Sequence, residues 1–232
     1  MTCDIFIRSY DGDNEWLKYC LRSIQRFATG FRKVVVVVPH GHNPPVGTAE
    51  TVFHVAEIGD QYLQQQVDKI HADHFTDAEF ILYQDSDTIF TQPVTPATFI
   101  VNNRRPVWLY TPYAELGNDE SQLWKEVTGK VLRRPVDKEF MRRHPFCISR
   151  AILREFRAWV HRVHGVTAER YVMTQPNHDF SEFNALGAWA WFFMQPEVEW
   201  KRPEDFPTFV HQHWSVGGFN PDIRKNIEMA LA

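Results

Sequence analysis

The chain of 232 residues has few cysteines and no long apolar segment. Cys3, Cys20 and Cys147 are an odd number and form no Cys-x-x-Cys pair, so neither a disulfide framework nor a zinc–thiolate site is expected. The longest apolar stretches, residues 34–38 and 185–194, are too short to span a bilayer, and the first residues do not resemble a signal peptide. These absences favour a cytoplasmic protein.

Glycine-rich phosphate loops are also missing. Neither G-x-G-x-x-G nor G-x-x-x-x-G-K occurs in the sequence, which disfavours nicotinamide-dependent enzymes and P-loop kinases. A diphosphate group would then have to be held through a metal ion. There is no repeat and no low-complexity stretch, which argues against solenoid and disordered proteins.

The composition is that of a soluble globular protein, with 44% hydrophobic and 23% charged residues. The net charge of −4 is unevenly distributed. Residues 125–170 contain twelve Lys and Arg against five Asp and Glu, a balance of +7 that leaves −11 for the rest of the chain. The basic segment therefore indicates either an anionic partner or a solvated helical face.

Strands and helices are predicted to alternate in the first 90 residues. Strands are expected at 3–9, 33–38, 51–55 and 79–84, and helices at 16–27 and 60–74. Later strands are expected at 106–110, 146–148 and 208–213, and a later helix at 150–164. The order predicts a Rossmann-like α/β fold with a mostly parallel sheet flanked by helices, in which ligands bind at the carboxyl ends of the strands.

The triplet Asp85-Ser86-Asp87 follows the predicted strand 79–84 directly. Two carboxylates this close together, where a strand leaves the sheet, are costly unless a positive charge lies between them. Hard oxygen ligands suit Mg²⁺ or Mn²⁺, which often bridge to phosphate oxygens. The alternative is a solvated turn or a helix cap.

The segment 80–90, followed by Pro93, resembles the strand and Asp-x-Asp motif of GT-A nucleotide-sugar glycosyltransferases. The preceding helix, with Gln66 and Lys69, is similar to the nucleotide-side helix of several such families. The resemblance covers about the first 115 residues. It implies a single GT-A-like domain over residues 1–232, with 1–115 binding the nucleotide sugar and 116–232 binding the acceptor.

The resemblance also implies a divalent cation, Mn²⁺ or Mg²⁺, at the triplet. Asp87 would ligate the metal directly, while Asp85 would bind the metal or the ribose and Ser86 would lie on the nucleotide side. A late histidine often completes the metal shell in this superfamily, and His213 is the candidate here. His211 lies on the same face of the predicted strand, and its role stays open.

Nucleotide contacts are implied for two further groups of residues. Ser9, Tyr10 and Asp11 end the first predicted strand and would frame the base and ribose. Gln66 and Lys69 belong to a polar stripe on the second predicted helix, which also contains Tyr62. Lys69 would add positive charge near the leaving diphosphate.

Acidic residues before the late aromatic helix are candidates for catalysis. GT-A enzymes commonly have an acidic residue near this point of the chain, facing the acceptor, and here it would be Glu182 or Asp179. In an inverting enzyme such a residue acts as general base. The alternative is that Asp179 or Ser181 caps the following helix. Inverting and retaining chemistry both stay open.

The sequence thus predicts a metal-dependent glycosyltransferase that moves a sugar from a nucleotide-sugar donor, expected to be a UDP-sugar, to a hydroxyl acceptor. The acceptor alternatives are a glycan, a lipid head group and a nucleic acid such as DNA with a hydroxymethylated base. The phosphates of such an acceptor would be bound by basic side chains, namely Arg133, Arg134, Arg142, Arg143, Arg150 and Arg154. The alternative functions are a nucleotidyltransferase of similar layout and a non-catalytic binder of sugar or nucleotide.

Overall fold

The computed structural model describes residues 1–47, 50–141 and 145–231, and its centre is a five-stranded sheet. The strands are β1 (Cys3–Arg8), β2 (Val34–Pro39), β3 (Glu50–Val55), β4 (Phe80–Tyr83) and β10 (Phe146–Ser149). Their order is β10-β4-β1-β2-β3, with β10 antiparallel to β4 and the other pairs parallel. The predicted α/β fold with a mostly parallel sheet is therefore confirmed.

The uninterrupted valine run of β2 follows from burial on both faces of the sheet. Val36 and Val38 belong to the apolar cluster beneath α1 (Asn14–Phe27), whereas Val35 and Val37 belong to the cluster on the opposite face. Because successive side chains of a strand point to opposite faces, both faces need apolar residues. The same alternation places the side chain of Ile5 beneath α1, and the neighbouring side chains of β1 point to the opposite face of the sheet.

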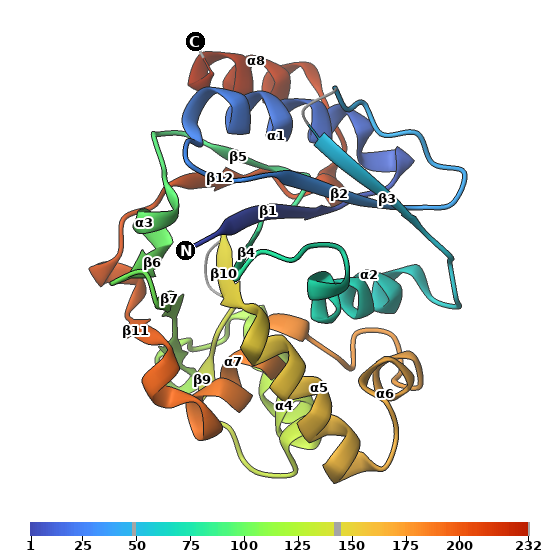
Figure 1. Ribbon diagram of the computed structural model, residues 1–232, viewed down its shortest axis with the longest axis vertical. Coiled ribbons are helices and arrows are strands. Elements are labelled where there is room, and N and C mark those ends of the chain that lie inside the picture. Colours follow the sequence, from blue (N-terminus) through green and yellow to red (C-terminus); the bar gives the residue numbers. More distant parts are fainter. Residues whose placement is uncertain (48–49, 142–144, 232) are drawn as a thin grey trace.

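Helices cover both faces of the sheet (Figure 1). α1 and α8 (Pro221–Ala230) lie on one side, and the opposite side has α2 (Gln61–Ile70), α4 (Leu123–Leu132), α5 (Arg150–His164), α6 (Ala168–Met173) and α7 (Glu182–Phe193). In α7, Gly187 lets the helix approach Phe140, because a Cβ atom at that glycine would lie 2.4 Å from the ring. Within the described residues, no helix is both long and apolar enough to cross a membrane.

Three small sheets flank the central one. β11 (Glu199–Lys201), β7 (Arg105–Leu109) and β6 (Ile100–Val101) form the first, next to the short helix α3 (Pro96–Phe99), and β8 (Thr111–Pro112) pairs with β9 (Lys138–Glu139). The third is the antiparallel pair of β5 (Thr88–Phe90) and β12 (Val210–Gln212). This pair brings the segment after β12 beside the acidic triplet, although Ser215 and Asp87 are 128 positions apart in the chain.

Most of the polar stripe of α2 is buried, whereas Tyr62 at its start borders an open pocket. Gln66 is 1% exposed, and its Oε1 accepts the backbone N–H of Glu182 at 3.1 Å. Asp73, just beyond the helix, is hydrogen-bonded by both terminal nitrogens of Arg157 on α5, at 2.6 and 2.8 Å. The stripe therefore fastens α2 to α5 and α7.

His71, at the C-terminal end of α2, makes stability depend on pH. Burial lowers its pKa from 6.5 to about 4, and its Nδ1 lies 3.0 Å from the carbonyl oxygen of Val67. Because the unfolded chain binds the proton more readily, the stability from neutral His71 is full above pH 6.5 and is lost as the pH falls toward 4. We expect the free energy of unfolding to fall by about 3 kcal/mol across that window.

Urea unfolding at a series of pH values tests this expectation. His71→Gln should show a weaker decline between pH 6.5 and 4, whereas a matched change at the exposed His161 should leave the decline unchanged. Part of the decline should remain in His71→Gln, because burial also lowers the pKa of His213 to about 4. An identical pH dependence in His71→Gln and the unaltered protein would contradict the assignment.

Candidate functional site

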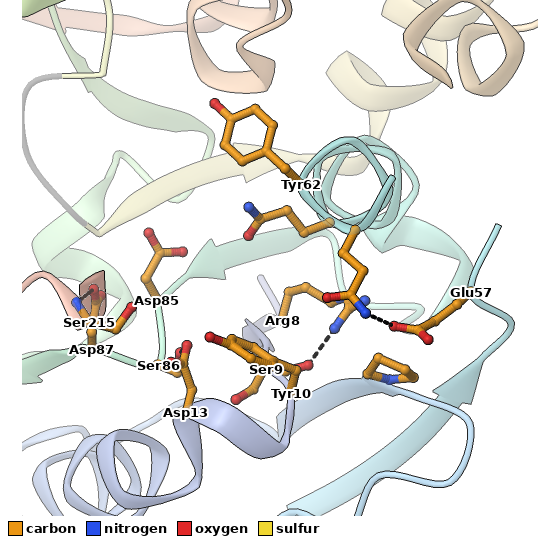
Figure 2. A pocket seen from close by; sticks show the side chains of 13 residues that line it. Arg8, Ser9, Tyr10, Asp13, Glu57, Tyr62, Asp85, Ser86, Asp87 and Ser215 are labelled. Carbon is orange, nitrogen blue, oxygen red and sulfur yellow. Dashed lines mark hydrogen bonds between the residues drawn. The ribbon is translucent and has the colours of Figure 1, made fainter. Parts of the chain in front are cut away.

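A polar pocket of about 280 Å³ opens at the carboxyl ends of β1 and β4 (Figure 2). At one end, which we call the acidic end, lie Asp13, Asp85, Ser86, Asp87 and Ser215. At the other, the α2 end, lie Glu57, Gln61 and Gln65. The remaining lining residues are Arg8, Ser9, Tyr10, Pro39 and Tyr62. The pocket lies where a Rossmann-like sheet is expected to bind its ligand.

Three carboxylates from two separate parts of the chain meet at the acidic end, Asp13 from one and Asp85 and Asp87 from the other. Asp13 comes from a 3₁₀ turn after β1, and its Oδ2 accepts a hydrogen bond of 2.7 Å from the Ser86 hydroxyl. Burial, and then the charge of Asp85, raises the pKa of Asp13 above its usual value. The backbone N–H of Ser215 donates to Oδ2 of Asp87 at 2.9 Å. Asp13 was missed in the sequence, where it reads as an ordinary turn residue.

Asp87 also constrains the segment that follows β12. Its backbone oxygen accepts the N–H of His213 at 2.9 Å, and its side chain accepts that of Ser215. Between them, Trp214 has a φ of 52° and is 67% exposed. A left-handed backbone is unusual for so bulky a residue. The two hydrogen bonds to Asp87 stabilise this conformation.

His213, the predicted third metal ligand, is near the triplet but does not line the pocket. Its Nε2 is buried and finds no hydrogen-bond partner among the described residues. Burial, and then the neighbouring His211, lowers its pKa to about 4, and the two rings lie 4.4 Å apart. In the part of the chain that the structure describes, no three His, Cys, Asp or Glu side chains are placed to hold one metal ion. The set Asp85, Asp87 and His213 therefore stays a prediction.

Lys69 lies behind Asp85 and does not line the pocket. Its side chain is 8% exposed, and its Nζ is 3.1 Å from Oδ1 of Asp85 and 2.9 Å from Oε1 of Glu182. Burial opposes the charge of Lys69, yet the two carboxylates raise its pKa above the ordinary value. Lys69 thus touches the acidic end from inside the protein, and Asp85 separates it from the pocket.

The two predicted catalytic acids are also away from the pocket. The side chain of Glu182 is 7% exposed and forms the ion pair with Lys69. Asp179 is partly exposed and begins no helix, since Ser181 is the residue before α7. Ser181 makes no side-chain capping hydrogen bond. Because neither acid lines the pocket, a role as general base stays a prediction for both.

Of the three residues predicted to frame the base and ribose, two line the pocket. Ser9 and Tyr10 line the pocket, whereas Asp11 accepts the backbone N–H of Asn43 at 2.9 Å and holds the loop after β2. Arg8 also lines the pocket and was missed. Its Nε lies 2.6 Å from Oδ2 of the buried Asp68, so its charge is already balanced by the protein.

The residues of the α2 end were likewise not predicted from the sequence as ligand-binding residues. Gln61 and Gln65 are one helical turn apart and therefore share a face of α2, with Glu57 in the loop before the helix. The i, i+4 spacing of two glutamines was a usable signal in the sequence. The predicted polar stripe, through Gln66 and Lys69, lies on a neighbouring line of the helix, one position away from Gln65.

The described part of the basic segment, residues 125–170, does not contribute to the lining of the pocket. Lys125, Lys130, Arg133 and Arg134 line an open hollow of about 600 Å³ at α4, and the guanidinium of Arg134 lies 3.8 Å from the centre of the Phe192 ring. Arg142 and Arg143 lie outside the described residues. No nucleic-acid or glycan acceptor is indicated by these positions, and that prediction stays open.

Comparison with known proteins identifies the fold of the chain but assigns it to no sequence family. No protein-family profile matches the chain, and no curated protein matches it significantly in sequence. Among solved structures, the chain is similar to 2-C-methyl-D-erythritol 4-phosphate cytidylyltransferase from Thermus thermophilus, with a TM-score of 0.51 and 16% sequence identity. The match covers 100% of this chain and 99% of that one. The similarity shows the α/β fold.

This comparison contradicts the glycosyltransferase function predicted from the sequence, because the matching structure is a nucleotidyltransferase. A link to the GT-A glycosyltransferase superfamily is not shown, nor are a UDP-sugar donor and a sugar acceptor. The physical reason for the error is that an Asp-x-Asp triplet after a buried strand can serve any reaction that needs a cation against phosphate oxygens. The triplet therefore does not distinguish sugar transfer from nucleotidyl transfer.

Proposed function

We propose that the chain is a nucleotidyltransferase that binds a nucleoside triphosphate, together with a divalent cation, in the pocket at the ends of β1 and β4. The fold of the similar cytidylyltransferase supports this proposal. So does the position of the pocket, since α/β sheets of this kind bind ligands outside the carboxyl ends of their strands.

The charge of the pocket is the observation that carries the proposal. Its described lining contains the carboxylates of Asp13, Glu57, Asp85 and Asp87 against the guanidinium of Arg8, which Asp68 already balances. A triphosphate would be repelled by this surface unless a cation accompanied it. The pocket therefore fits a nucleotide–cation complex better than a free nucleotide.

The side chains fit such a cation. Mg²⁺ keeps several waters and is usually held by one or two carboxylates together with substrate phosphates. Asp85 and Asp87 both line the acidic end, and Lys69 holds one oxygen of Asp85 from behind. When bound, the cation would neutralise charge on the phosphates and on the departing pyrophosphate. Because no three-ligand group is preformed among the described residues, we expect the cation to bind weakly without a nucleotide.

Release of pyrophosphate is the direct test. The protein is incubated with ATP, CTP, GTP or UTP and Mg²⁺ or Mn²⁺, alone and with a panel of phosphorylated acceptors, and pyrophosphate is measured. We expect cation-dependent release from at least one nucleotide. Isothermal titration with and without the cation gives a second readout, in which nucleotide affinity should fall roughly tenfold or more when the cation is removed.

The other functions give distinct results when a nucleotide sugar is added to the same experiment as a further substrate. Nucleotide binding without any pyrophosphate release, across the whole acceptor panel, would indicate a binding protein and contradict the proposal. Release of a nucleoside diphosphate from a nucleotide sugar, without pyrophosphate from any triphosphate, would also contradict it.

A further inference from the structure

The α2 end of the pocket has its own pattern of hydrogen-bonding groups. We propose that it selects a nucleobase whose edge places an exocyclic amino donor beside a ring-nitrogen acceptor, as in cytosine and adenine. This inference rests on the proposed function and adds the class of nucleotide. Figure 2 shows Glu57 across the pocket from Asp85, Asp87 and Ser215, so the phosphates and the base would occupy opposite ends.

The hydrogen bond between Gln61 and Glu57 fixes the orientation of the Gln61 amide. Nε2 of Gln61 donates to Oε1 of Glu57 at 2.8 Å, shown as a dashed line in Figure 2. A carboxylate accepts hydrogen bonds and cannot donate them, so the amide oxygen of Gln61 must point away from Glu57. The pair therefore presents acceptors to a ligand, namely Oε1 of Gln61 and the second oxygen of Glu57.

Gln65 supplies the complementary donor. It lies one turn after Gln61, lines the pocket, and has a side-chain amide that makes no hydrogen bond with the described residues. An amino group of the base would donate to the Gln61–Glu57 pair, and its ring nitrogen would accept from the Gln65 amide. Uracil and hypoxanthine present the reverse order, a carbonyl oxygen beside an N–H, and their oxygen would face the Glu57 carboxylate.

Tyr10 borders the space between the two ends, because its hydroxyl interacts with Asp13 at the acidic end while its ring offers a face toward the nucleotide. Its side chain is 44% exposed and lines the pocket. The ring lies against Gly12, where an added Cβ atom would be 2.4 Å from Cε2 of Tyr10. Glycine at this position therefore makes room for the ring, and an exposed aromatic face beside polar groups is suited to stacking on a base.

Matched pairs of nucleotides test the inference. CTP is compared with UTP, and ATP with ITP, by isothermal titration in the presence of Mg²⁺, because each pair differs at the amino position and the adjoining ring nitrogen. We expect CTP and ATP to bind about tenfold more tightly than their partners, as for hydrogen bonds to a charged group. Glu57→Gln should bring both ratios close to one, because an amide can also donate to a carbonyl oxygen.

Both substitutions are made at exposed residues, so that a change in nucleotide affinity does not arise from a loss of folding. Glu57 is exposed, and Glu155→Gln on the exposed side of α5 is the matched control, which should keep the preference for CTP and ATP. Equal affinities for CTP and UTP, or tighter binding of UTP, would overturn the inference while leaving the proposed function intact. Pyrophosphate release without any preference among the bases would likewise overturn the inference and leave the proposed function intact. Absence of binding by all four nucleotides would overturn both.

Discussion

Replacing Lys69 with methionine is expected to lower the free energy of unfolding by about 3–5 kcal/mol, the usual cost of breaking a buried ion pair from one side. The ammonium group lies between Asp85 and Glu182 at 3.1 and 2.9 Å, and its side chain is 8% exposed. Methionine fills a similar volume but leaves two carboxylates facing each other without a counter-charge. Urea unfolding at pH 7 measures the loss.

A second substitution identifies the cause of that loss. Lys69→Met combined with Glu182→Gln removes one of the two uncompensated charges, so the double variant should recover a large part of the lost stability. Lys130→Met is the matched control, because Lys130 forms an exposed pair with Glu126 at 3.2 Å and such pairs contribute little. Equal stability of Lys69→Met and the unaltered protein, or no recovery in the double variant, would show that the ion pairs are unimportant.

The arrangement around Lys69 illustrates what the sequence could predict. The valine run of β2 and the apolar strand before Asp85 predicted the sheet, because burial on both faces demands continuous apolar residues. The helical spacing of α2 was also correct, and Lys69 was singled out. Whether Lys69 would contact a ligand or a carboxylate depends on how α7 packs, and a local pattern contains no information about that.

Asp13 and Ser215 show the same limit for the pocket. Each lies far in the chain from the triplet that it joins, and each is positioned by tertiary hydrogen bonds to Ser86 or Asp87. Neither has a distinctive sequence context. The triplet itself was correctly placed just after β4, yet the reaction that it was expected to serve, sugar transfer, was assigned wrongly, because a cation site for phosphate is common to several reactions.

Substitution of Asp87 separates its proposed role toward the cation from its structural role. Asp87→Asn keeps an oxygen that can accept the N–H of Ser215, which now donates at 2.9 Å, but it removes the negative charge. Asp87→Ala removes both. If Asp87 ligates the cation, both variants should lose roughly 100-fold or more in pyrophosphate release, because the remaining carboxylates cannot replace a direct ligand.

The two variants should differ in the segment around Trp214. The left-handed backbone of Trp214, with φ of 52°, is stabilised by hydrogen bonds from His213 and Ser215 to Asp87. Asp87→Ala frees the Ser215 N–H, so amide hydrogen exchange at Ser215 should accelerate by roughly tenfold or more, whereas Asp87→Asn should keep most of the protection. Asp87→Asn that retains full activity would contradict the cation role. If both variants lose activity but only Asp87→Ala loses protection, the charge of Asp87 serves the ligand and its hydrogen bonds hold the wall of the pocket.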